Sequence, residues 1–150
     1  MRGTLLYERG EKTFALVFDE ADDVLSELTA FARTQRLSGS HFTAIGAFSE
    51  VTLGYFDRHR KDYRRIVIAE QVEVLSLVGD VALENGEPKV HAHVVVGKAD
   101  GTAHGGHLLH ARVWPTLELV LEESPTHLRR RFDPASGLAL IDIERSREAA

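Results

Sequence analysis

Residues 89–107 read KVHAHVVVGKADGTAHGGH, a stretch that combines a buried-strand pattern with four histidines. His91 and His93 are two positions apart, and alternate side chains of a strand point to the same face. Their Cα atoms are expected about 6.5 Å apart, which lets two imidazoles reach one ion. Three neutral imidazoles with an open fourth position are the usual arrangement of a ligand-exchanging zinc site. The pattern therefore predicts a metal site that His91 and His93 share with a third histidine.

The third histidine depends on how the strand pairs with the chain that follows it. A two-residue turn at Asp100-Gly101 would bring His110 to the face of the two strand histidines. A β-bulge at Gly105-Gly106 would instead bring His107 to that face, since glycine permits such a bulge at low cost. His104 lies nearer the turn and is not expected to be a ligand. Spacing alone leaves His107 and His110 open.

Composition limits the class of protein. The chain has 150 residues, enough for one domain, and no cysteine, so any metal site must use His, Asp or Glu. The absence of cysteine, of an apolar signal segment at the N-terminus and of any apolar run near ~18 residues predicts a cytoplasmic protein that does not enter a membrane. The formal net charge of −5 disfavours general nucleic-acid binding.

The remaining sequence predicts one domain, residues 1–150, of the α+β class with a mainly antiparallel sheet and one main helix. Apolar spacing predicts the helix over residues 22–36, with Gly39 just beyond its end. Asn85-Gly86 predicts a tight hairpin, and residues 9–11 a further turn. Residues 145–150 are expected to be a disordered tail. Strands are expected at residues 4–7, 13–18, 41–48, 51–56, 66–68, 72–83, 90–96, 114–122 and 138–141.

Five segments occur in an order that resembles the PPC domain, the plant and prokaryote conserved domain. They are Gly46–Phe56, Val72–Val81, His91-x-His93, Gly105-Gly106-His107-Leu108 and Thr116–Val120. The resemblance extends over nearly the whole chain, from about Thr4 to Ile143. Because no AT-hook segment is present, the chain resembles the stand-alone prokaryotic type.

This resemblance implies a PPC-like fold, a homotrimer and a metal held by His91, His93 and His107. Zinc is the metal expected for three imidazoles, with another divalent ion as the alternative. Acetolactate decarboxylase, a zinc lyase of similar architecture, also has H-x-H followed by G-G-H, but its other catalytic residues have no counterpart here. Plant relatives bind DNA through an AT-hook, so direct DNA binding is not expected of this chain. The expected partners are further copies of the chain, with a small-molecule ligand or another protein.

Other polar residues have two interpretations. Glu118 is either a carboxylate that orients a histidine or activates water, or an exposed strand residue. Residues 58–65, read RHRKDYRR, are either a phosphate or nucleic-acid contact or a solvated hairpin loop, and the acidic chain favours the loop. Asp80 and Glu73 are expected to be solvated charges only. Gly79, inside a strand, marks a bulge or a close approach of two chains.

Two functions of different classes fit these residues. One is a trimeric metal-binding protein of the DNA-binding and regulatory family, acting through a ligand or partner. The other is a zinc-dependent enzyme, lyase-like or hydrolase-like, that acts on a small carbonyl or carboxylate substrate. The sequence does not decide between them, and it assigns no catalytic residue.

Overall fold

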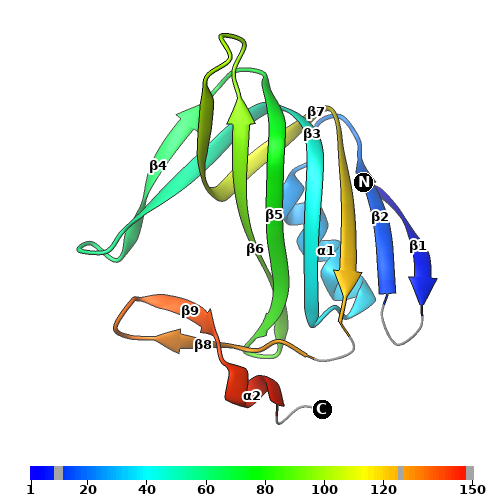
Figure 1. Ribbon diagram of the computed structural model, residues 1–150, viewed down its shortest axis with the longest axis vertical. Helices are drawn as coiled ribbons and strands as arrows, with labels where there is room; N and C mark the ends of the chain where they lie inside the picture. The colour runs from blue at the N-terminus through cyan, green and yellow to red at the C-terminus, as the bar shows by residue number, and fades with distance from the viewer. Residues whose placement is uncertain (9–11, 125–126, 148–150) are drawn as a thin grey trace.

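The computed structural model describes residues 1–8, 12–124 and 127–147 (Figure 1). Its elements, in chain order, are β1 (Arg2–Glu8), β2 (Lys12–Phe18), α1 (Val24–Gln35), β3 (Gly39–Asp57), β4 (Asp62–Ile68), β5 (Val72–Glu84), β6 (Glu87–Gly97), β7 (Ala103–Glu123), β8 (Arg130–Asp133), β9 (Leu138–Ile141) and α2 (Ile143–Arg147). The turn expected at residues 9–11 lies outside the described residues.

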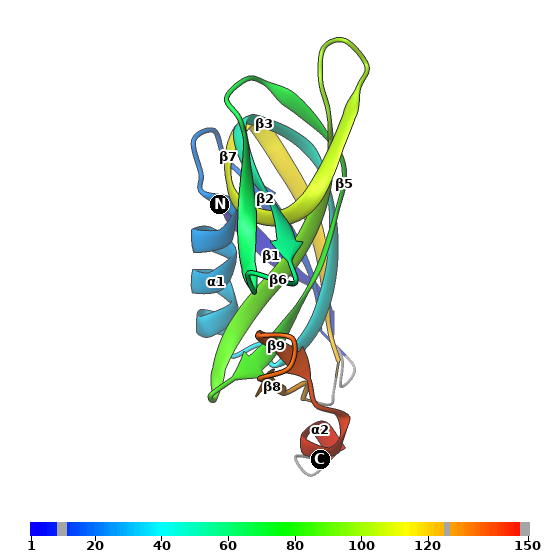
Figure 2. The same ribbon diagram turned by 90° about the vertical axis from the view of Figure 1, so that its left-hand side faces the viewer.

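One antiparallel sheet organises the chain. Its strand order is β1-β2-β7-β6-β5-β3-β4, with a further pairing between β7 and β3, and β8 and β9 form a separate hairpin. The sheet curls around α1, which lies against one of its faces (Figure 2). This mainly antiparallel fold with a main helix is the architecture predicted from the sequence. The core between helix and sheet includes the fully buried Phe18, Phe42 and Phe48.

Helix α1 forms where the apolar spacing predicts it, within two residues at each end. Asp23 caps its N-terminus. Its side chain accepts a 2.8 Å hydrogen bond from the Ser26 amide. Arg36, with φ 56°, takes the left-handed conformation that ends the helix. The buried stripe that faces the sheet comprises Val24, Leu28 and Ala32.

Two strands are much longer than the sequence pattern indicated. β3 continues through residues 49–50, where a break was expected, and β7 begins at Ala103 and includes the stretch before Trp114. Gly46 allows β3 to bend without ending, because its φ of 151° and the closeness of the Thr116 carbonyl exclude a side chain there. The glycine therefore marks a bend inside one strand rather than its end.

The end of the chain also differs from expectation. No strand was expected between residues 122 and 138, but Arg130–Asp133 forms β8 because it pairs with β9. A four-residue polar strand has no sequence signal of its own. Part of the expected tail forms α2, through Arg147, and residues 148–150 lie outside the described residues. Within the described part of the chain, no helix is long and apolar enough to cross a membrane.

A two-residue turn joins β5 to β6, as predicted. Asn85 and Gly86 have φ of 53° and 85°. A type I′ hairpin turn requires such a pair of positive values. The turn sets a register in which Asp80 lies opposite His91. Gly79 is the close approach predicted, since a Cβ there would overlap the Phe42 ring and the His91 carbonyl.

The connection from β6 to β7 has one residue more than predicted. Lys98 donates a 2.9 Å backbone hydrogen bond to Thr102, so residues 99–101 form a three-residue turn. Gly101 takes the left-handed position of this turn with φ 82°, as is usual for glycine in such loops. The register is regular from there to the pair His93–His107. The prediction of a bulge at Gly105-Gly106 is wrong for the pairing of β6 with β7, because the extra residue lies in the turn.

Candidate metal centre

Three histidines from two neighbouring strands meet at one point. His91 and His93 share a face of β6, and His107 of β7 lies directly opposite His93. Each can offer a nitrogen atom within 4.8 Å of those of the other two. A zinc ion bonded to all three at about 2.0–2.1 Å would hold these nitrogens roughly 3.4 Å apart. Small side-chain rotations are enough to reach that geometry, so the donor set fits a metal.

Glycines make room for this arrangement. Gly106 passes so close to β3 that an added Cβ would lie 2.8 Å from the Gly54 carbonyl oxygen. At Gly54 an added Cβ would lie 2.7 Å from the Tyr63 ring, which instead stacks on His107 with centroids 4.6 Å apart. The Tyr63 hydroxyl is 3.5 Å from Nδ1 of His107. With Nδ1 facing the phenol, Nε2 of His107 is left for a metal.

The surroundings keep two of the imidazoles neutral. Burial lowers the pKa of His107 to about 4, and the neighbouring His91, His93 and Lys89 add to the effect. Burial and the closeness of His91 also lower the pKa of His93, although its side chain is the most exposed of the three. Only a neutral imidazole has a lone pair for a metal, so both residues are ready ligands at neutral pH.

The carboxylate of Asp80 orients His91. Asp80 Oδ2 lies 3.5 Å from Nδ1 of His91, and Asp80 Oδ1 accepts a 2.5 Å hydrogen bond from Nη2 of Arg130. Burial by itself raises the pKa of Asp80, but its contacts with His91 and Arg130 outweigh burial and lower it. An ionised Asp80 favours the proton on Nδ1 of His91, which leaves Nε2 free for a metal.

The prediction that Asp80 is a solvated charge is therefore wrong. The contact between Asp80 and His91 could have been predicted from the sequence, because the Asn85-Gly86 turn fixes their pairing. The contact between Asp80 and Arg130 could not, because Arg130 lies on β8, a strand without a sequence signal.

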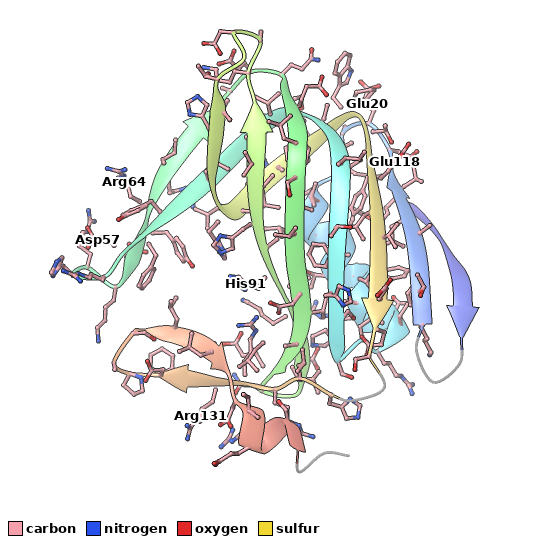
Figure 3. The ribbon with its side chains drawn as sticks, viewed as in Figure 1. Glu20, Asp57, Arg64, His91, Glu118 and Arg131 are labelled. Atoms are coloured by element: carbon pink, nitrogen blue, oxygen red, sulfur yellow. The ribbon has the colours of Figure 1, made fainter. Side chains whose placement is uncertain are left out.

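A cavity of about 310 Å³ opens beside the histidines. Figure 3 shows His91 between the sheet and the β8–β9 hairpin. The residues that line the cavity are Tyr63, Glu84, Lys89, Val90, His91, His107, Arg130, Leu138, Ala139 and Leu140. A small molecule can therefore reach the side of the cluster formed by His91 and His107.

The structure places the other candidate residues elsewhere. His110 has Nδ1 2.8 Å from an Asp23 oxygen and Nε2 3.2 Å from a Glu50 oxygen, so both its nitrogens face carboxylates. His104 is exposed, near the turn. Glu118 is exposed between Ile45 and Val17, its partners on β3 and β2, far from His91 (Figure 3). It does not orient a histidine.

The basic stretch at residues 58–65 forms the tip and second strand of the β3–β4 hairpin. Arg58, His59 and Arg60 are exposed, and their backbone is held by Asp57, which accepts bonds from His59 and Arg60. Lys61 is tied to the β8–β9 turn by a 2.6 Å hydrogen bond to the Pro134 carbonyl. Exposure of this stretch is common to a solvated loop and to a phosphate or nucleic-acid contact, so the solvated loop stays a prediction.

Comparison with known proteins identifies the family of the chain. The Plants and Prokaryotes Conserved (PCC) domain matches residues 6–125. The chain belongs to this family. The PCC family is the PPC domain that the sequence motifs resemble. The part of the chain that matches the family ends before β8.

Two solved structures are similar over almost the full chain. A candidate DNA-binding protein from Bacteroides thetaiotaomicron has 27% identity and a TM-score of 0.86, covering 95% of this chain and 99% of its own. A metal-containing protein from Archaeoglobus fulgidus has 34% identity and a TM-score of 0.82, with the same coverage of both chains. The PCC fold of this chain is thus shared with a protein that contains a metal.

A curated relative is much longer. The bifunctional protein GlmU from Synechococcus sp. (strain JA-3-3Ab) is 35% identical over 130 residues, which are 85% of this chain and 20% of that protein. The chain therefore spans about a fifth of this relative.

The Asp80–Arg130 pair should contribute to stability as a unit. The Arg130 side chain is only 8% exposed, so Asp80→Ala leaves a buried cation without its carboxylate. We expect a loss of about 3–5 kcal/mol in the free energy of unfolding of the metal-free protein, measured in urea. Glu73→Ala, an exposed carboxylate on the same strand, should change it by less than about 0.5 kcal/mol.

Adding Arg130→Met to Asp80→Ala should recover part of this loss, because the unpaired charge is then gone. Strictly additive effects of the two substitutions would contradict the coupling.

Proposed function

We propose that this PCC-domain protein is a homotrimer that holds one zinc ion per chain through His91, His93 and His107. The observation that carries the proposal is the convergence of three imidazoles, two of them kept neutral, at one point beside a cavity. The metal-containing relative from A. fulgidus supports a metal in this fold.

Zinc is the ion that this donor set favours. Three histidine nitrogens and no thiolate suit zinc in a site with an exchangeable fourth position, whereas calcium and magnesium prefer oxygen ligands. Asp80 Oδ2 lies 3.5 Å from Nδ1 of His91, where a carboxylate behind a zinc-bound histidine favours the proton on that nitrogen. The open side of the site lies toward the cavity, so a small molecule can approach the ion.

The proposed role is regulatory: binding of a small ligand or a protein partner at the metal-containing trimer. The DNA-binding description of the B. thetaiotaomicron relative supports a regulatory role for the fold. Direct contact with DNA is not part of this proposal, since the sequence contains no AT-hook and has a net charge of −5.

The cavity also favours a second candidate function, a zinc-dependent lyase or hydrolase for a small carbonyl or carboxylate compound. A zinc ion with an open position polarises a carbonyl or activates water. Tyr63, close to His107, is the group best placed to exchange a proton with a bound compound.

Removing single histidines tests the metal site. His107→Ala should abolish zinc binding at micromolar concentration, while His110→Ala should leave it nearly intact, because His110 faces Asp23 and Glu50 instead. Zinc per chain, measured by elemental analysis after dialysis, should be close to one for the wild type and for His110→Ala.

Circular dichroism of each variant separates a lost ligand from a lost fold. Zinc retained by a folded His107→Ala variant but lost by His110→Ala would refute this ligand set.

An exposed apolar face supports the homotrimer. Ile45, Leu75, Val78 and Val120 are between 46% and 62% exposed on the face of the sheet opposite α1. Two shallow hollows cross this face, and both include Ile45 and Leu75. Contiguous apolar surface on a sheet is a common site of self-association, and the trimer would bury it.

The trimer predicts a mass close to three chains by light scattering at low micromolar concentration. Ile45→Glu, which puts a charge in the apolar face, should reduce the mass toward one chain. Ile143→Glu is a matched control, since Ile143 on α2 is 63% exposed and Ile45 is 62% exposed. A wild-type protein with the mass of a single chain would contradict the proposal.

A further inference from the structure

One wall of the cavity comes from outside the family match. The PCC domain matches residues 6–125, whereas Leu138, Ala139 and Leu140 of the cavity wall belong to β9. These three residues give the cavity an apolar wall. Lys89, Tyr63 and the two histidines that line it give the other side a polar character. A cavity divided in this way suits a ligand with one polar and one apolar end.

We propose that this cavity binds a small organic carboxylate, with its carboxylate toward Lys89 and the histidine cluster and its short alkyl part against Leu138 and Leu140. The inference rests on the proposed metal site and names the class of ligand that reaches it.

The charges around the cavity favour an anionic ligand. Asp80 is already paired with Arg130 at 2.5 Å, and three neutral imidazoles do not compensate the charge of a divalent ion. Glu84, which also lines the cavity, has its carboxylate 3.9 Å from the Lys89 ammonium, at the limit of an ion pair. The Lys89 side chain is 63% exposed and can turn toward a ligand. The metal-loaded cavity therefore has excess positive charge.

The available donors match one carboxylate better than a phosphate. Arg130, the residue whose fork would best bind a phosphate, already uses Nη2 for Asp80 and Nη1 for the Ala139 carbonyl. Nε of Arg130 has no partner among the described residues, but it is fully buried. The donors of the described cavity wall that a ligand can reach are then the Lys89 ammonium and the Tyr63 phenol. The volume of about 310 Å³ is at the small end of the range for ligand pockets, which points to a molecule of a few carbon atoms.

The apolar wall is held in place from three sides. Leu83 of β5 donates a 2.8 Å backbone hydrogen bond to Leu128, ahead of β8. Lys61 bonds the Pro134 carbonyl at the hairpin turn, and Arg130 joins β8 to Asp80. Two of these contacts fix the wall to β5, the strand paired with β6. Because the wall is fixed, Leu138 and Leu140 can select ligands by the length of their alkyl part.

Calorimetric titration of the zinc-loaded protein with acetate, propanoate and butanoate tests this inference. Affinity should rise about fourfold for each added methylene group. Butanamide, of nearly the same shape but neutral, should not bind measurably. Lys89→Met should weaken butanoate binding at least tenfold with its zinc content unchanged. Lys98→Met, which removes a lysine paired with Glu70 away from the cavity, should have no effect.

Leu138→Ala should weaken butanoate binding and leave acetate binding unchanged. The Leu138→Ala measurement does not depend on the lysine variants, so it tests the inference even if Lys89→Met fails to fold.

The possible failures are distinguishable. If the protein takes up no zinc, the proposed function fails and this inference falls with it. If zinc is bound but butanoate does not bind saturably, only the inference is overturned. Inorganic phosphate that binds more tightly than butanoate, or equal affinities along the acid series, would show a bare anion site and overturn the carboxylate assignment. Equal losses in Lys89→Met and Lys98→Met would show a general charge effect and also overturn it.

Discussion

The pairing of β6 with its two neighbours is the constraint on which the candidate site depends. Side chains alternate between the faces of a strand, so a slip of one residue would turn a histidine to the wrong side. The turn at Asn85-Gly86 sets one register and the three-residue turn ending at Gly101 sets the other. Together they place Asp80 and His107 beside the histidines of β6. Two turns thus decide whether there is a cluster at all.

The polar cluster is stable because its charges are paired and the pKa values of His93 and His107 are lowered. Burial disfavours charged imidazoles, which is why the pKa of His107 falls to about 4. Asp80 remains ionised because Arg130 and His91 contact it. Arg130 also fastens the β8–β9 hairpin beside the cluster, so the same ion pair orients a histidine and positions a wall of the cavity. Structure and candidate function are coupled through this pair.

The sequence predicted the elements whose signals are local. α1, the turn at Asn85-Gly86 and the shared face of His91 and His93 follow from spacing and from turn chemistry. His107 was assigned through family resemblance, and the bulge expected to place it is absent from the β6–β7 pairing, because spacing could not distinguish a two-residue turn from a three-residue one. β8 and Arg130 were missed because their conformation depends on distant contacts with β9 and Asp80. Spacing was therefore sufficient to bring His91 and His93 together, the family resemblance was needed for His107, and neither indicated the cavity around them.

Anomalous X-ray scattering from a zinc-containing crystal, collected on both sides of the zinc absorption edge, tests the central claim most directly. The account predicts one strong zinc peak per chain, at about 2.0–2.1 Å from a nitrogen of each of His91, His93 and His107. A peak bonded to His110, or crystals of the zinc-treated protein with no peak at the three histidines, would contradict it.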